Sequence, residues 1–165
     1  MRAVETKCSE CQKNAAHLKC GLCEAALCRS CAEVCNEPDF SFFKVAPKGL
    51  LHGIFCETCF QQTVLPQIDV FNEVMDKAKD VMVYMKDQSK ESRLFRRTEK
   101  PIVVENCNDR EDTLLRLAFQ AVQLGFNAIV DVELAPTKVI DHAYQTTSWR
   151  GVAMPVQATA AQLRR

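Results

Sequence analysis

The sequence predicts an α+β protein with three consecutive parts. Cysteines recur in close pairs over the first 59 residues, and apolar residues recur at helical spacing between Ile68 and Met85. The last third of the chain alternates strand-like and helix-like patterns. A chain of 165 residues, 47% of them hydrophobic, suits two small domains. We therefore expect a cysteine-rich module over 1–65, a helical linker over 66–92 and a two-layer β-α-β-β domain over 93–165.

The cysteine pairs have the spacing of metal ligands. In a C-x-x-C segment the two thiolates lie on one tight turn, from which both can bind the same ion. Four such pairs supply eight sulfur atoms, the number that two tetrahedral zinc ions require. The sequence therefore predicts two zinc ions per chain, held by the pairs Cys8/Cys11, Cys20/Cys23, Cys28/Cys31 and Cys56/Cys59.

The separations along the chain indicate which pairs share an ion. Eight residues separate the first pair from the second, four separate the second from the third, and 24 separate the third from the fourth. The second and third pairs are too close to enclose one ion without a cramped loop, whereas alternate pairs give each ion well-separated ligands. We therefore expect a cross-brace, with one zinc on Cys8, Cys11, Cys28 and Cys31 and the other on Cys20, Cys23, Cys56 and Cys59.

This order of pairs resembles that of FYVE, PHD, RING and B-box zinc fingers, in which the first and third pairs share one metal ion and the second and fourth share the other. The segment CSECQKNAAHLKCGLCEAALCRSC, residues 8–31, looks most like a B-box. The histidines that close a B-box are replaced by Cys56 and Cys59, as in a FYVE finger. The basic cluster of phosphoinositide-binding FYVE fingers and the spacing of RING-type ligases are both absent, so the resemblance favours the fold over either activity.

Disulfide bonding is the alternative for the paired cysteines. The chain opens with MRAVETKC and has no apolar segment typical of a secretory signal, which predicts a cytoplasmic protein in a reducing environment and favours zinc. Cys35 or His52 can replace one ligand of the second site, although we expect both to be bystanders. Cys107 is expected to be a small buried residue at a strand end.

The segment between the third and fourth pairs predicts a hairpin. Residues 40–55 contain two β-rich runs around Pro47-Lys48-Gly49, and the fourth pair then opens a helix with Glu57 in its first turn. With residues 20–23 as the zinc knuckle, the order of knuckle, hairpin and helix is that of a treble clef. A module of about sixty residues buries little apolar surface, so we expect the two ions to supply most of its folding free energy.

The linker is predicted to be helical. Pro66 is expected to end or kink the treble-clef helix, and a second helix follows. Its apolar residues recur at steps of three and four from Ile68 to Met85, a stripe of about two and a half heptads. We expect this stripe to pack on the same chain, with self-association as the alternative. The polar run from Lys86 to Ser92 marks the end of the linker.

The C-terminal part begins with a strand and a helix. Residues 101–106 are typical of a strand, and Asn108 or Asp109 can cap the helix that follows. Apolar residues fall on one face of this helix, which is expected to end at Gly125.

Two further strands complete the pattern. Residues 127–134 alternate, so Ala128, Val130, Val132 and Leu134 are expected on one face. A loop at Pro136 and a long final strand over 143–156 follow, which gives the order β-α-β-β.

This part of the chain carries a second resemblance. The run LAFQAVQLGFNAIVDVELAPTKV and the strand YQTTSWRGVAMPV resemble the YbjQ-type family, also called the heavy-metal-binding domain, over roughly residues 101–156. Phe126 and Asp131 stand where that family has a small residue and a glycine. The resemblance implies a dodecin-like fold that assembles into rings, and hence a homo-oligomer. Metal-ligand candidates in this part are Asp131, Glu133, Asp141 and His142, which we expect to be solvated instead.

Composition narrows the class of function. Basic and acidic residues number 21 each, and eight thiolates with two Zn²⁺ ions lower the formal charge to about −4. Nucleic-acid binding is therefore not expected, because it needs an excess of basic residues. No apolar run is long enough to span a membrane, so we do not expect the protein to be membrane-bound.

The sequence indicates a binding protein. It contains no glycine-rich phosphate loop, no nucleophile elbow and no H-E-x-x-H segment, and closed four-cysteine sites leave no open coordination position for catalysis. We expect a non-enzymatic adaptor whose zinc finger is an interaction module on an oligomerising YbjQ-like domain, with a protein partner that the sequence does not name. The alternative is a heavy-metal or redox-responsive protein whose thiolates exchange or release metal.

Overall fold

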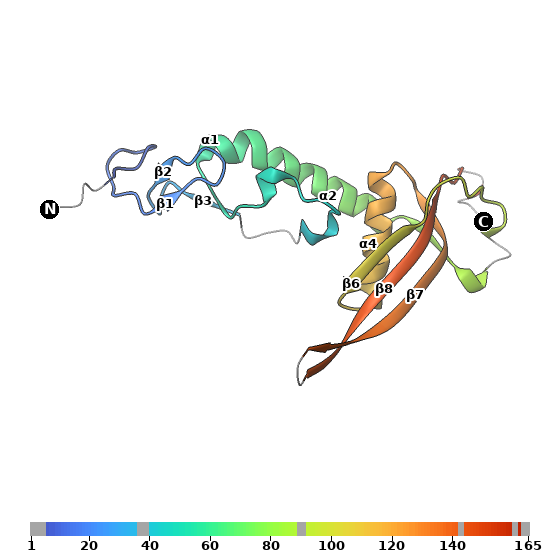
Figure 1. The fold of residues 1–165 in the computed structure, drawn as a ribbon. Coiled ribbons are helices and arrows are strands. Elements are labelled where there is room, and N and C mark those ends of the chain that lie inside the picture. The colour runs from blue at the N-terminus through green and yellow to red at the C-terminus, as the bar shows by residue number, and fades with distance from the viewer. Residues whose placement is uncertain (1–5, 36–39, 89–91, 142–143, 160–161, 163–165) are drawn as a thin grey trace. The chain divides into compact units, whose positions relative to one another are not determined.

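The chain adopts a mixed α+β fold, as its sequence predicts. The computed structural model describes residues 6–35, 40–88, 92–141, 144–159 and 162. The chain divides into two compact units, residues 1–72 and 73–165. The first contains two small hairpins and the cysteine pairs, and the second contains a four-stranded sheet packed on a helix (Figure 1).

The N-terminal unit has little regular structure. Strand β1 (Leu18–Lys19) pairs with β2 (Ala26–Leu27), and β3 (Glu33–Val34) pairs with β4 (Ile54–Phe55), both antiparallel. Each strand is two residues long, too short to be stable without further support. Its small core consists of cysteines together with a few apolar side chains, which are Leu27, Leu50, Phe55 and Val64.

The hairpin predicted over residues 40–55 is wrong. This segment forms two 3-10 turns, η1 (Phe40–Phe42) and η2 (Lys48–Leu50), and only β4 is a strand. The phenyl rings of Phe40, Phe42 and Phe43 pack against that of Phe71, with centroids 5.4, 6.4 and 5.5 Å away. Aromatic packing on a helix therefore replaces strand pairing here.

One long helix begins at the fourth cysteine pair. It consists of α1 (Glu57–Cys59), a π-helical turn η3 (Phe60–Val64) and α2 (Leu65–Lys79), 23 residues in all. Glu57 lies in the first turn, as predicted. The helix does not end at Pro66. A proline removes one backbone donor, and the wider π-turn directly before it accommodates the altered hydrogen bonding.

The helix predicted over the linker is only partly correct. Its apolar stripe is half-buried or buried at Ile68, Phe71, Met75 and Ala78. Beyond Lys79 the chain turns and forms strand β5 (Met82–Met85), followed by a 3-10 turn η4 (Lys86–Gln88). Valine and tyrosine favour strands, and every residue of β5 is half-buried, so burial on both faces of a sheet replaces burial on one face of a helix.

The C-terminal unit contains one more strand than predicted. Its elements are β5, β6 (Ile102–Cys107), α4 (Arg110–Gln123), β7 (Ala128–Asp141) and β8 (Tyr144–Val156). The sheet order is β5-β7-β8-β6, with β5 parallel to β7 and the other pairs antiparallel. Helix α4 packs on one face of this sheet (Figure 1).

Both ends of α4 match the sequence pattern. Asp109 is the N-cap, and its carboxylate accepts a hydrogen bond of 2.8 Å from the amide of Asp112. At the other end Gly125 has a φ of +88°, a conformation that glycine adopts without strain. The amides of Gly125 and Phe126 donate to the carbonyls of Val122 and Ala121, which satisfies the last turn.

A bulge in β7 divides its side chains between two faces. The pairing with β8 shifts between Val130 and Glu133, and Asp131 has a φ of +52°. Ala128 and Val130 therefore pack with Phe95 on one side, whereas Val132 packs beneath α4 on the other. The prediction that all four apolar residues of 127–134 share one face is wrong, because it assumed an uninterrupted alternation.

The loop predicted at Pro136 is also wrong. Strand β7 continues through Pro136, which lies opposite Trp149 of β8, and the two strands extend as a ribbon to Asp141 and Tyr144. Strand β5 pairs with β7 only as far as Val132, so the other edge of β7 is unpaired at Pro136 within the described part of the chain. A proline fits there because no neighbouring strand needs its missing amide. Ala143, where the last strand was predicted to begin, lies outside the described residues.

Candidate metal centres

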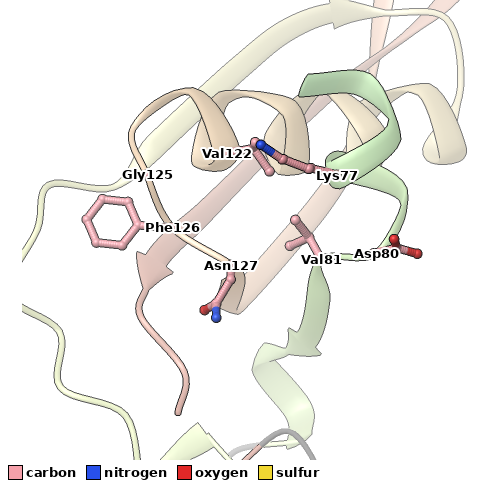
Figure 2. Close-up of a pocket in the computed structure, with 7 residues that line it drawn as sticks. All are labelled: Lys77, Asp80, Val81, Val122, Gly125, Phe126 and Asn127. Atoms are coloured by element: carbon pink, nitrogen blue, oxygen red, sulfur yellow. The ribbon is translucent and has the colours of Figure 1, made fainter. Parts of the chain in front are cut away.

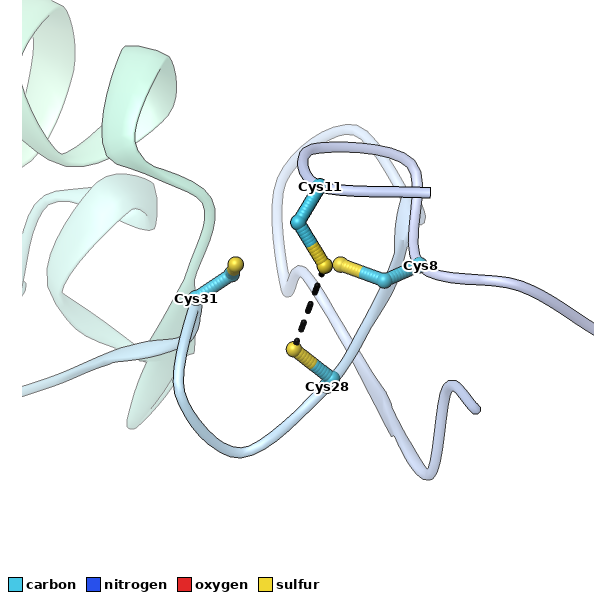
Figure 3. Close-up of side chains that lie close together, drawn as sticks. All are labelled: Cys8, Cys11, Cys28 and Cys31. Atoms are coloured by element: carbon cyan, nitrogen blue, oxygen red, sulfur yellow. Dashed lines mark hydrogen bonds between the residues drawn. The ribbon is translucent and has the colours of Figure 1, made fainter. Parts of the chain in front are cut away.

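The first group of thiols lies at the N-terminal end of the unit. Its members come from the turn after Lys7, whose bridge to Ala15 closes a small loop, and from the segment that follows β2. The four sulfur atoms point toward a common centre (Figure 3). All lie within 4.8 Å of one another, and the residues are Cys8, Cys11, Cys28 and Cys31.

The second group joins the β1–β2 hairpin to the long helix. Cys20 and Cys23 lie in the turn between the two strands, where the amide of Cys20 donates to the carbonyl of Ala25. Cys56 is the N-cap of α1, and its sulfur accepts a hydrogen bond of 3.4 Å from the amide of Cys59. These four sulfur atoms also lie within 4.8 Å of one another.

The two groups have the dimensions of tetrahedral metal sites. With zinc–sulfur bonds of about 2.3 Å, the edges of a regular tetrahedron measure about 3.8 Å. The sulfur atoms of Cys11 and Cys28 lie 3.8 Å apart, and those of Cys23 and Cys56 lie 3.7 Å apart. Each group can therefore hold one metal ion, and zinc suits a donor set made only of thiolates. The membership of each group is the one expected from alternate pairing of the C-x-x-C segments.

The electrostatics of the first group favour a bound cation. The hydroxyl of Ser30 lies 3.1 Å from the sulfur of Cys28 and lowers the pKa of that thiol to about 5, against the opposing effect of burial. The neighbouring sulfur of Cys28, together with burial, raises the pKa of Cys31 to about 12. One thiolate thus disfavours ionisation of the neighbouring thiol, and a divalent cation between them would relieve the repulsion of the two negative charges.

The second group also combines a thiol of lowered pKa with a thiol of raised pKa. Burial disfavours the charged form of Cys20, but the backbone amides of Cys23, Cys56 and Leu22 outweigh it and lower the pKa of Cys20 to about 6. The pKa of Cys59 is raised well above its usual range, first by hydrogen bonding with Cys56 and then by burial. Both groups therefore need a cation if all four sulfur atoms are to be ionised together.

Two residues that support the first group were missed by the sequence analysis. Ser30 contacts Cys28 as described, and the side-chain amide of Asn14 lies 3.8 Å from the same sulfur and 3.4 Å from the hydroxyl of Ser30. The position of Ser30 inside the third C-x-x-C segment was the available signal. No signal in the sequence pointed to Asn14, because this residue lies 14 positions from Cys28 and approaches it only in the folded chain.

The remaining cysteines and histidines lie outside both groups. Cys35 and His52 are absent from the four-sulfur clusters, and His52 is exposed. Cys107 is 2% exposed at the end of β6, which confirms its prediction as a small buried residue at a strand end. No disulfide joins any of the ten cysteines, all of which lie in the described ranges.

Two of the candidate metal ligands of the C-terminal unit, Asp131 and Glu133, are engaged in ion pairs. Asp131 pairs with the guanidinium of Arg97, which lowers the pKa of its carboxyl group against the effect of burial. Glu133 pairs with Lys86. The described residues of this unit form no cluster of three or more metal-ligating side chains. His142, the fourth candidate from the sequence, lies outside the described residues.

The C-terminal unit also has a surface hollow of about 410 Å³ (Figure 2). It lies where α4 ends and β5 begins, and its lining residues are Lys77, Asp80, Val81, Val122, Gly125, Phe126 and Asn127. Its polar groups are largely committed elsewhere. The ammonium of Lys77 donates to Glu73 at 2.6 Å, and the side chain of Asn127 exchanges hydrogen bonds of 2.9 and 2.7 Å with the backbone of Ala158.

Comparisons with known proteins identify no relative. No protein-family model matches the chain, and no curated protein and no solved structure matches it either. The resemblances to cross-brace zinc fingers and to the YbjQ-type family therefore rest on the motifs alone. No helix among the described residues combines the length and the apolar character needed to cross a bilayer.

Replacing one cysteine tests the membership of the second site. We expect Cys20→Ser or Cys59→Ser to reduce the zinc content from two ions per chain to one and to destabilise the N-terminal unit by several kcal/mol, because metal binding in such modules is coupled to folding. Zinc content is measured by atomic emission, and stability by urea titration followed by circular dichroism.

Cys35→Ser and Cys107→Ser are the matched controls, since neither thiol belongs to a four-sulfur group. Both variants are expected to keep two zinc ions. Loss of a zinc ion from Cys35→Ser but not from Cys56→Ser would show that the second site is wrongly assigned.

Proposed function

We propose that the protein is a non-enzymatic adaptor whose N-terminal unit is a two-zinc interaction module. The observation that carries this proposal is the pair of four-thiol groups, each complete without any other ligand. A tetrahedral ion with four thiolate ligands has no open position for water or substrate, so such sites serve structure. The fold around them is small and its strands are very short, which makes the ions its main source of stability.

The surface of the zinc module suits contact with another protein. Val34 is 56% exposed and Leu51 is 65% exposed, although both side chains are apolar. Amides and carbonyls of the short strand β3 are paired only with β4 in the described part of the chain. Apolar side chains beside an incompletely paired strand are features that protein-interaction surfaces share.

Metal removal distinguishes a structural role of the ions from a catalytic one. We expect the purified protein to carry two zinc ions, and a strong chelator to abolish the far-UV signal of the N-terminal unit as the ions leave. The fluorescence of Trp149, the only tryptophan, should not change, because this partly buried residue packs against the core of the C-terminal unit. Zinc added back should restore the signal.

A stoichiometry near one zinc ion, or a far-UV spectrum that survives complete removal of metal, would contradict the proposal.

We further propose that the C-terminal unit self-associates through β6. The long strand β8 lies between β7 and β6, so the edges of the sheet are β5 and β6. Strand β6 has one unpaired side among the described residues, and Val103 in its middle is 42% exposed. An uncovered edge strand with an apolar residue favours pairing with a second copy, which the YbjQ resemblance also implies.

A charge on this edge should prevent assembly. We expect the zinc-loaded protein to sediment as a discrete oligomer and Val103→Lys to shift it toward monomer, because lysine on an edge strand opposes strand pairing. Val70→Lys is the matched control, since Val70 is 56% exposed on α2 and is not part of the sheet. The measurement is sedimentation velocity at tens of micromolar. A monomeric wild-type protein, or an equal effect of both substitutions, would remove β6 as the contact.

A further inference from the structure

The two thiol groups differ in their access to solvent. In the first group Cys8 and Cys28 are buried, and Cys11 and Cys31 are partly buried. In the second group Cys20 and Cys56 are buried and Cys59 is partly buried, but Cys23 is exposed. Cys23 is therefore the most accessible of these eight residues to a reagent in solution.

The exposure of Cys23 follows from its place in the β1–β2 turn. The turn closes tightly, because the amide of Glu24 donates to the carbonyl of Cys20 at 3.0 Å and Glu24 adopts a φ of +61°. This conformation directs the end of the turn outward, and Glu24 itself is exposed. The start of the long helix approaches Cys23 at Cys56.

The first group is better protected chemically as well. The sulfur of Cys28 has the hydroxyl of Ser30 and the amide of Asn14 as neighbours. Hydrogen bonds to a thiolate lower its pKa, and once ionised a thiolate of lower pKa is a weaker nucleophile. In the described part of the chain Cys23 has no such contact with a side chain other than cysteine. Its sulfur lies 3.7 Å from that of Cys56.

We propose that Cys23 is the site at which a hydroperoxide first oxidises this protein, and that a disulfide between Cys23 and Cys56 then releases the metal ion of the second site alone. The inference rests on the proposed metal occupancy of both groups. It assigns the redox response to one pair of sulfur atoms.

The chemistry balances with the peroxide as the oxidant. The thiolate of Cys23 attacks one peroxide oxygen, the O–O bond breaks, and water leaves after the second oxygen takes a proton. The thiolate of Cys56 then attacks the sulfur of the resulting sulfenic acid, the S–O bond breaks, and the hydroxide that leaves takes a proton from solvent to form a second water. Two electrons pass from the two sulfur atoms to the peroxide. Only the thiolates of Cys20 and Cys59 would then remain to hold an ion in the second site, too few to retain it.

The disulfide would keep the β1–β2 hairpin joined to the long helix. Cys23 belongs to the β1–β2 hairpin and Cys56 caps the long helix, so a disulfide between them joins the same two elements. The sulfur atoms must approach from 3.7 Å to a bond length of about 2.0 Å, a small movement for an exposed turn. Oxidation is therefore expected to be reversible, with a reductant and zinc restoring the site.

The test treats the full-length zinc-loaded protein with one equivalent of hydrogen peroxide. Zinc content is measured first, released zinc is followed with a chromogenic chelator, and disulfides are mapped by mass spectrometry after alkylation. We expect one zinc ion per chain to be released, together with a Cys23–Cys56 disulfide. Release of both ions at the same rate, or a first disulfide among the cysteines of the other group, would overturn the inference.

Two histidine substitutions provide a matched comparison, because a histidine can replace a thiolate as a zinc ligand without forming a disulfide. Cys23→His is expected to keep two zinc ions and to slow the faster release to the rate of the slower one. Cys11→His, the control in the first group, is expected to respond like the wild type. Unchanged release from Cys23→His would contradict the inference. If Cys23→His binds only one ion, the disulfide mapped in the wild type still tests whether Cys23 pairs with Cys56.

The zinc content before oxidation and the order in which the ions are released test two separate claims. A zinc content well below two before peroxide is added would contradict the metal sites themselves. Two bound ions that leave together would contradict only the assignment to Cys23.

Discussion

The convergence of eight thiols on two points is the constraint on which the N-terminal unit depends. Its strands have two residues each, and cysteines make up half of the buried residues of its core. Four ionised sulfur atoms cannot share one site without a cation, as the opposed pKa shifts of Cys28 and Cys31 indicate. A metal ion bound in each group would stabilise the fold in two ways, because it would neutralise the thiolates and join segments that lie far apart in sequence.

The C-terminal unit depends on a different constraint, the bulge in β7. At Asp131 the strand changes which face its side chains occupy, so one strand contributes both to the core under α4 and to the cluster around Phe95. Asp131 has a left-handed backbone, for which glycine is the least strained residue. Its carboxylate pairs with Arg97. Arg97 comes two residues after Phe95, which packs on Ala128 and Val130. An ion pair therefore accompanies the strained backbone conformation at Asp131.

The spacing of the cysteines predicted the two groups well, because ligand geometry depends on short segments. The helix α4 and its caps were predictable for the same reason. The failures involve contacts between distant segments. Phe40 and its neighbours pack on Phe71 instead of forming a hairpin, and Met82–Met85 pairs with β7 although its apolar residues also fit a helical stripe. The bulge at Asp131 depends on the partner strand, and the exposure of Cys23 depends on the turn that holds it.

X-ray absorption at the zinc edge tests the central claim most directly, because it reports the atoms bound to the metal. If both ions are held by four cysteines each, the spectrum will show only sulfur neighbours, about four per zinc at about 2.3 Å. A nitrogen or oxygen neighbour at about 2.0–2.1 Å would show that a histidine such as His52, or water, completes a site. That result would contradict the closed four-thiolate centres on which the structural role of the ions rests.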